Sequence, residues 1–281
     1  MGDLYRMMFR LTIVGVGIVA LLLGLMLGVV LGDVQDDVEY FAADARNGRA
    51  TRSDGMKESK IYVMAALGEY GIPAYMQPAA GCHNIVATMK GTQPETYIVV
   101  GAHLDHLGVR RGKVMNGADD NASGSAALLE LAGRLSMIKT RRSIVLVWFT
   151  GEERGLLGSK SFVRGLDQMP VFMVNLDMVG RLSDDLPGSK GKPGSLAPLF
   201  KKYDFAKRVT YRDSKLGSDQ VPFNGKCPTV FLHTGLHRLY HTSADDPGTL
   251  DYDGIELICD YAYDMIVQVV GLDYRLYGGS E

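Results

Sequence analysis

Apolar and polar residues alternate in blocks along the chain from residue 57 onward. Short apolar runs rich in Val, Ile and Phe are typical of buried strands, and longer segments with an apolar residue every three or four positions are typical of helices. The pattern predicts strands at residues 83–90, 97–104, 143–150, 171–179 and 228–234, and helices at residues 57–70, 122–137, 155–165, 195–203 and 253–270. This alternation indicates an α/β fold, in which a mixed, largely parallel central sheet has helices on both faces.

Residues 11–32 differ from the rest because they carry no charge. As a helix they would span roughly 30 Å, the thickness of a bilayer core. Arg6 and Arg10 precede the run and acidic residues follow it, so the positive-inside rule places residues 1–10 in the cytoplasm. A cleaved signal peptide, which would make the protein secreted, is the alternative, but its apolar region is usually shorter. We therefore expect a single-pass membrane protein with a transmembrane anchor at 11–32.

The remainder of the chain divides into two parts on this reading. Residues 33–56 are polar and rich in small residues, as in a juxtamembrane tether or a short helix that leads into the domain. Residues 57–281 are expected to form one domain outside the cytoplasm, periplasmic or at the cell surface. The net charge of −2 and the lack of a basic stripe argue against nucleic acid as a partner. Cys82, Cys227 and Cys259 lie far apart in the sequence and form no CxxC pair, which argues against a thiolate metal site.

Polar side chains follow the strongest apolar runs of the sequence. These residues are His103, Asp105, Asp119, Asp120, Glu152, Glu153, Asp177 and His241. Ligands in open α/β sheets bind beyond the carboxyl ends of the strands, so we expect these side chains to meet at one edge. Each alone has an ordinary explanation, since Asp caps helices and Glu is favourable at their first turn. Together, so many carboxylates would repel one another unless cations lay among them.

Imidazole and carboxylate ligands without a thiolate suit zinc, with manganese or cobalt as substitutes. One catalytic zinc needs three protein ligands, and this set offers more. The set holds five ligands without counting Asp105, Asp120 and Glu152, and two zinc ions about 3.5–4 Å apart, bridged by one carboxylate, would use all five.

Five motifs in this order resemble a known family. GAHLDHLG, NGADDNASGSAALLELA, FTGEERGLLGS, NLDMVGR and YHTSADD are similar to motifs of the co-catalytic di-zinc exopeptidases, which include bacterial leucyl aminopeptidases, aminopeptidase Y and glutamate carboxypeptidase. The resemblance covers roughly residues 57–270 and implies the zinc-exopeptidase, phosphorylase/hydrolase-like fold.

The resemblance also implies a role for each matched residue. His103 and Asp177 would bind one zinc, Glu153 and His241 the other, and Asp119 both. Glu152 would be the general base, and the Asp105 carboxylate would hydrogen-bond the distal nitrogen of His103. The peptide bond between Asp119 and Asp120 is expected to be cis. Tyr240 is a candidate for stabilising the oxyanion, or it is simply packed at the end of a strand.

The implied activity is hydrolysis of peptides by an exopeptidase, with the aminopeptidase favoured. A carboxypeptidase or dipeptidase stays open, and Arg181 is its candidate cation for a substrate carboxylate. Glutaminyl cyclases share the fold but bind one zinc and typically lack the first His ligand, and non-catalytic binding relatives have lost ligands. The presence of His103 with the other ligands argues against both. His83, His106, His233 and His237 match no ligand position and are interpreted as structural.

Overall fold

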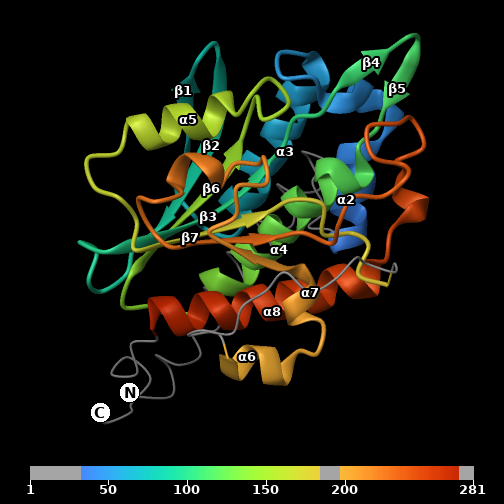
Figure 1. Cartoon of the computed structure of the whole chain (residues 1–281). Helices are drawn as coiled ribbons and strands as arrows, with labels where there is room; N and C mark the ends of the chain where they lie inside the picture. Colours follow the sequence, from blue (N-terminus) through green and yellow to red (C-terminus); the bar gives the residue numbers. More distant parts are fainter. Residues whose placement is uncertain (1–32, 184–196, 272–281) are drawn as a thin grey trace, which may run out of the picture. The chain divides into compact units, whose positions relative to one another are not determined.

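The computed structural model describes residues 33–183 and 197–271 (Figure 1). Its main sheet has seven strands, in the order β1 (Ala74–Ala79), β2 (Cys82–Met89), β6 (Ser143–Phe149), β3 (Tyr97–His103), β7 (Phe172–Leu176), β9 (Thr229–Leu232) and β8 (Thr210–Arg212). Strands β6, β3, β7 and β9 are parallel neighbours, and β1, β2 and β8 are antiparallel additions at the two sides. The predicted mixed sheet with a parallel centre is confirmed.

The helices lie on both faces of this sheet. They are α2 (Val34–Ala42), α3 (Asp54–Glu69), α4 (Gly124–Ser136), α5 (Leu157–Arg164), α6 (Ala197–Lys202), α7 (Ala206–Val209) and α8 (Tyr252–Val270). Helix α4 packs against β3, β6 and β7, with α2, α3 and α8 around it, whereas α5 covers β1 and β2 on the other face (Figure 1). The indole of Trp148 on β6 donates a hydrogen bond to the Ser125 carbonyl at 3.2 Å, which fixes α4 to the sheet.

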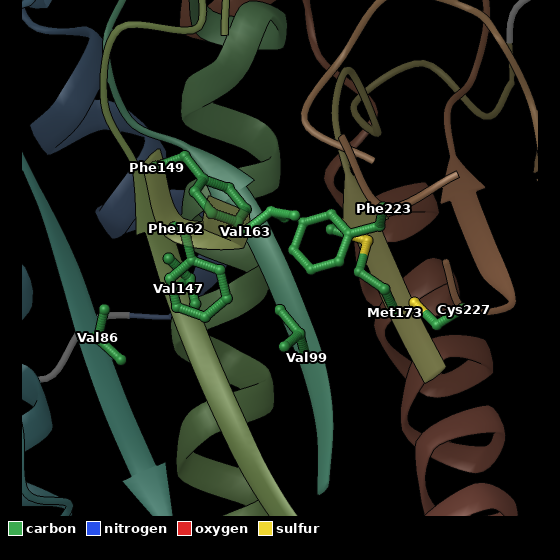
Figure 2. Packing of buried hydrophobic residues seen from close by; sticks show 9 residues of the cluster. All are labelled: Val86, Val99, Val147, Phe149, Phe162, Val163, Met173, Phe223 and Cys227. Atoms are coloured by element: carbon green, nitrogen blue, oxygen red, sulfur yellow. The ribbon is translucent and has the colours of Figure 1, made fainter. Parts of the chain in front are cut away.

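A cluster of apolar side chains fills the space between the sheet and α5 (Figure 2). Val99, Val147 and Met173 come from three neighbouring strands, and Phe162 comes from α5. The Phe162 ring lies edge-on to Phe149, with ring centroids 5.9 Å apart. Because the strands are buried on both faces, their sequences read as continuous apolar runs, which is why the pattern located them well.

The edge strands were missed by the sequence pattern. Strand β1 contains Pro78 and is only partly buried, and β8 has three residues, so neither shows a strong apolar run. A proline is tolerated at an edge because one side of that strand has no partner. A two-stranded hairpin of β4 (Gly108–Arg110) and β5 (Lys113–Met115) was also missed. It connects β3 to the turn η2 (Ala118–Ser123), which leads into α4.

The segment predicted as a tether at 33–56 is instead part of the folded domain. Asp33 caps α2 by accepting a hydrogen bond from the Asp36 amide at 3.0 Å. Val38 and Phe41 of this helix are fully buried, and the helix packs against α4 and α8. The turn η1 (Asp44–Arg49) follows, and Ser53 then caps α3. The fold therefore includes Asp33 and does not begin near residue 57.

The predicted anchor at 11–32 lies outside the described residues. Among the helices within 33–183 and 197–271, none combines the length and the apolar character needed to cross a membrane.

Candidate metal centre

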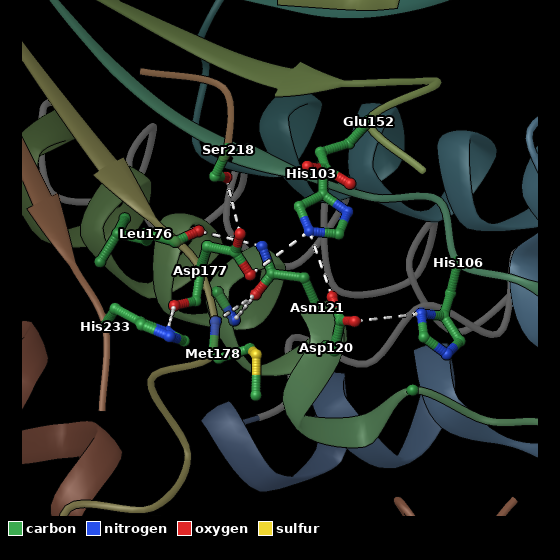
Figure 3. A network of polar contacts seen from close by, with 12 residues as sticks. His103, His106, Asp120, Asn121, Glu152, Leu176, Asp177, Met178, Ser218 and His233 are labelled. Atoms are coloured by element: carbon green, nitrogen blue, oxygen red, sulfur yellow. Dashed lines mark hydrogen bonds and ion pairs between the residues drawn. The ribbon is translucent and has the colours of Figure 1, made fainter. Parts of the chain in front are cut away.

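Predicted site residues converge at the carboxyl ends of the central strands, and Figure 3 shows His103, Asp120, Glu152 and Asp177 among them. His103 is the last residue of β3, and Asp177 directly follows β7. Glu152 and Glu153 lie in the turn between β6 and α5, and His241 lies in the loop after β9. Side chains that are far apart in the sequence thus meet at one edge of the sheet, as the strand-end pattern predicted.

Three buried side chains form a first group of possible metal ligands. The Nε2 atom of His103 lies 3.3 Å from Oδ1 of Asp120 and 3.4 Å from Oδ1 of Asp177. The three donor atoms lie within 4.8 Å of one another, close enough to share one ion. The second oxygen of Asp177 accepts a hydrogen bond from the Ser218 hydroxyl at 2.6 Å, which orients the carboxylate (Figure 3).

A second group lies on the other side of Asp120. Its Oδ2 atom is 2.9 Å from Nε2 of His241 and 3.7 Å from Nδ1 of His106. Oε1 of Glu153 is 2.9 Å from Nδ1 of His106 and 3.4 Å from Nε2 of His241. Asp120 therefore directs one oxygen to each group, which is the arrangement of a carboxylate that bridges two ions.

The shared position belongs to Asp120, and the expectation for Asp119 is corrected. Oδ1 of Asp119 accepts from the Gly180 amide at 2.8 Å, and its Oδ2 lies 3.0 Å from Nε2 of His237. Asp119 thus binds the loop after β7 and lies outside both groups. The cis peptide bond likewise joins Asp120 to Asn121, one residue later than expected. Two identical neighbours in an irregular turn point in different directions, and the sequence alone does not say which one faces the site.

His106 is the second residue whose position differs from expectation. It was interpreted as structural, but its ring is fully buried against Glu153 and Asp120. The available signal was the position of His106 in GAHLDHLG, only three residues after His103, where β3 ends. His237 contacts Asp119, and His233 lies 2.8 Å from the Asp177 carbonyl, so these two histidines hold the surrounding loops.

Asp105 acts on the neighbouring turn and less directly on His103. Nδ1 of His103 lies 3.0 Å from the backbone carbonyl of Asp105 but 4.0 Å from its carboxylate. A carbonyl only accepts, so Nδ1 carries the proton and Nε2 is left to face the carboxylates. The Asp105 carboxylate instead accepts from the Glu152 amide at 3.2 Å and from the Thr51 hydroxyl at 2.9 Å. It therefore positions the turn that carries Glu152.

Opposing pKa shifts mark the acidic residues of the site. Burial alone would raise the pKa of Asp120, but the adjacent imidazoles of His103 and His241 hold it well below its usual range. Burial would also raise the pKa of Glu153, but its contacts with His106 and His241 lower that pKa to about 2. Burial, together with Asp219 and Asp177, raises the pKa of Glu152 to about 9 despite the opposing effect of His103. Glu152 differs from its neighbours because no imidazole contacts it directly, and it belongs to neither group.

The donor atoms of the two groups fit divalent metal ions. Both ring nitrogens of His106, Oε1 of Glu153 and Oδ1 of Asp177 are buried and have no hydrogen-bond partner among the described residues. Buried polar atoms are normally paired, so orphaned nitrogens and oxygens that face one another indicate a missing cation. Nitrogen and oxygen donors without sulfur are those expected for zinc.

A cavity of about 640 Å³ opens beside these groups. Asp120, Glu152 and Asp177 line one side, and the remaining wall includes the apolar or aromatic residues Met178, Tyr211, Leu216, Phe231, Leu236 and Tyr240. Tyr240 stacks on His241 with ring centroids 3.8 Å apart. Burial and the nearby Asp120 and Glu153 raise the pKa of its phenol, so it remains a hydrogen-bond donor at neutral pH.

A model of Peptidase family M28 matches residues 84–266, a range that contains both ligand groups. The chain belongs to peptidase family M28. This match confirms the resemblance to zinc exopeptidases carried by the five motifs. Leupeptin-inactivating enzyme 1 of Streptomyces exfoliatus is 33% identical to this M28 chain over 214 residues, which make up 69% of the chain and 46% of that protein. The chain spans less than half the length of the first curated relatives it matches.

Solved structures have the same fold as this M28 chain. The LapA aminopeptidase of Legionella pneumophila superposes with a TM-score of 0.70 at 23% identity, over 85% of this chain and 73% of that one. A glutaminyl cyclase of Porphyromonas gingivalis superposes with a TM-score of 0.66 at 19% identity, over 85% of this chain and all of the cyclase. The likeness to both kinds of enzyme shows the fold, and the choice between them depends on the site.

Proposed function

We propose that this M28 chain is a two-zinc exopeptidase that removes residues from the amino termini of peptides. The observation that carries the proposal is the Asp120 carboxylate, whose two oxygens face two separate groups of buried donors. A shared carboxylate of this kind suits a pair of metal ions about 3.5–4 Å apart. The family match and the similarity to curated leucine aminopeptidases support the same reading.

Each residue of the site has a role in this proposal. His103 and Asp177 would hold one zinc, Glu153 and His241 the other, and Asp120 both, with His106 as a further donor of the second group. Bound zinc would polarise the scissile carbonyl and supply hydroxide at neutral pH. Cations bound in the two groups would lower the raised pKa of Glu152. Its carboxylate, which lines the cavity outside both groups, would then accept the proton of the attacking water and pass it to the leaving amine. The Tyr240 phenol would donate a hydrogen bond to the developing oxyanion.

The charges around the cavity favour the aminopeptidase direction. Glu152 lines the cavity and binds no metal in this proposal, so its carboxylate would attract the α-ammonium group of a substrate. Arg181 was the cation considered for a carboxypeptidase, but it donates a hydrogen bond to the Thr249 hydroxyl at 2.7 Å and does not line the cavity. The second candidate, a carboxypeptidase or dipeptidase, is favoured by Arg212, a guanidinium residue on the cavity wall.

Substrate panels and metal analysis test this proposal. We expect two zinc ions per chain, hydrolysis of aminoacyl p-nitroanilides, loss of activity with a chelator and recovery on adding zinc. An N-acetylated substrate should resist the enzyme, because its α-ammonium group is removed. Release of the last residue from an N-acetylated peptide would instead establish a carboxypeptidase. One zinc per chain with cyclisation of an N-terminal glutamine would identify a glutaminyl cyclase, and zinc binding without any turnover a binding protein.

We further propose that residues 11–32 anchor the protein in a membrane, with the M28 domain outside the cytoplasm. The uncharged run and the basic residues before it support this topology. Protease added to intact cells should degrade the domain. Protection of the domain in intact cells, together with its recovery in the soluble cytosolic fraction, would contradict the topology.

A further inference from the structure

The loop at residues 116–120, which carries Asp120, is bonded on one side by a buried arginine. Arg49 has no exposed surface. Its Nη1 donates to the Asn116 carbonyl at 2.7 Å, and its Nη2 donates to the Gly117 carbonyl at 2.9 Å. Its Nε donates to the carbonyl of Leu104 at 3.1 Å, between His103 and Asp105. One guanidinium therefore joins the loop after β3 to the loop before α4.

A buried carboxylate bonds the other end of the same loop. Asp245 is also fully buried, and its Oδ1 accepts from the Asp119 amide at 3.0 Å. Its Oδ2 accepts from the Asp120 amide at 3.1 Å, and its backbone carbonyl accepts from Ala118 at 3.0 Å. Asp245 lies four residues after His241, so the Asp120 loop is attached to the loop that carries the imidazole of the second group.

The loop has no spare room to adopt another path. Gly117 has a φ of +57°, in the left-handed region that favours glycine. A Cβ atom there would lie 2.3 Å from the Asp120 carbonyl oxygen and 2.5 Å from the His106 ring. The direction of the Asp120 side chain therefore depends on the contacts that hold this backbone.

We propose that Arg49 and Asp245 are positioning residues that hold the 116–120 loop between opposite charges and so place the Asp120 carboxylate between the two metal groups. The loop directs carbonyls to the cation and amides to the anion, and both contacts are shielded from water. Water cannot replace buried hydrogen bonds of this kind, so losing them moves the loop. The inference rests on the proposed two-zinc function, because it concerns how that site is shaped.

The experiment compares zinc affinity in two variants and two matched controls. Arg49→Lys keeps the charge, but the three N–H groups of an ammonium cannot serve the four carbonyls of Phe41, Leu104, Asn116 and Gly117. Asp245→Asn keeps the shape but presents an NH₂ group to a backbone amide. The control Arg142→Lys changes an arginine that donates to the Val269 carbonyl away from the site. The control Asp251→Asn changes a carboxylate that accepts from two amides, those of Ser183 and Gly254.

Both test variants should bind zinc about 10- to 100-fold more weakly, the usual effect of losing the groups that orient metal ligands. The affinity for both ions should fall, because Asp120 is shared, and kcat should fall with KM nearly unchanged. The unfolding free energy of the metal-free proteins is measured in parallel. The controls should change that free energy while leaving zinc affinity within about twofold, because neither side chain bonds the 116–120 loop.

The outcomes separate this inference from the proposed function. If the unaltered protein binds fewer than two zinc ions, the two-zinc proposal fails. If it binds two, and the test variants bind zinc as tightly as the controls do, or lose affinity only in proportion to stability, the positioning role is overturned. Should Asp245→Asn not fold, Asp245→Glu replaces it. This change keeps both acceptor oxygens but displaces them by one methylene. Unchanged zinc affinity in Asp245→Glu would equally refute the positioning role.

Discussion

At the scale of the residue, Asp119 and Asp120 show how neighbours of identical chemistry take different roles. Asp120 faces His103 and His241, whereas Asp119 accepts the Gly180 amide and contacts His237. The sequence identified the pair as metal-related but assigned the shared position to the wrong member. A pattern of residue types carries no information about which way each side chain leaves an irregular turn.

Substituting each aspartate separately tests this assignment. Asp120→Asn should lose metal from both groups and lower kcat/KM by about 10³-fold or more, since the metals supply several kcal/mol of charge stabilisation. Asp119→Asn should keep both metals and lose less than about tenfold, because its oxygen still accepts from Gly180. Metal analysis and steady-state kinetics measure both effects. A metal-free Asp119→Asn protein beside a loaded Asp120→Asn protein would reverse the assignment.

Glu152 allows a second test at this scale. It lines the cavity outside both ligand groups, so Glu152→Gln removes the base without removing a ligand. We expect both metals to stay bound and kcat to fall by about 10²- to 10⁴-fold, the usual contribution of a general base. The matched change Glu153→Gln should instead release metal. If metal content and activity fell together in Glu152→Gln, the carboxylate would be a ligand and not the base.

At the scale of the element, helix α2 shows that a polar, charged segment can still be part of a core. Its sequence VQDDVEYFA places Val34, Val38 and Phe41 on one buried stripe, with acidic residues between them. Asp37 is nevertheless buried, and it accepts a hydrogen bond from the Tyr62 hydroxyl at 2.6 Å. The segment was interpreted as a tether or a short leading helix because its apolar residues are few, and only the contacts with α4 and α8 make it part of the core.

The buried Asp37 predicts a dependence of stability on pH. Burial raises its pKa to about 7, against a hydrogen bond from Tyr62 that lowers it. The folded state therefore favours the protonated carboxyl of Asp37. This stabilisation is fully present below the unfolded pKa of about 3.9 and is lost as the pH rises to about 7. Asp37→Asn keeps an acceptor for Tyr62 and removes the ionisation. Relative to the unaltered protein, this variant should gain up to about 4 kcal/mol in unfolding free energy between pH 4 and pH 7. Denaturant titrations across that range test this, and a constant difference would contradict it.

At the scale of the whole molecule, the N-terminal segment 33–53 and the ligand loops form one cooperative unit. The described residues from Asp33 to Gly271 belong to a single compact unit. Through Arg49, this segment reaches the carbonyls of Leu104, Asn116 and Gly117 beside the ligands. A segment that precedes the family match at residue 84 is therefore part of the structure that supports the site.

Truncation tests this dependence. A chain that begins at Asp33 should fold and bind two zinc ions. A chain that begins at Asp54 loses Arg49 and the burial of Val34, Val38 and Phe41, each worth about 1.5–3 kcal/mol. That sum is comparable to the whole stability of a domain, about 5–15 kcal/mol, so the shorter chain should be unfolded or unable to retain zinc. Circular dichroism and metal analysis distinguish the two. A shorter chain with native zinc affinity would show that the segment is dispensable.

The sequence by itself determined the α/β class, the central strands and most of the residues from which the candidate metal centre is built. These features follow from local rules, because a strand buried on both faces must be apolar and ligands gather at the ends of parallel strands. Only the tertiary structure decided that Asp120 is shared, that His106 belongs to the site and that residues 33–53 support it. Those features depend on the direction of side chains in irregular turns and on contacts between distant segments. Both are set by packing and buried hydrogen bonds that no local pattern encodes.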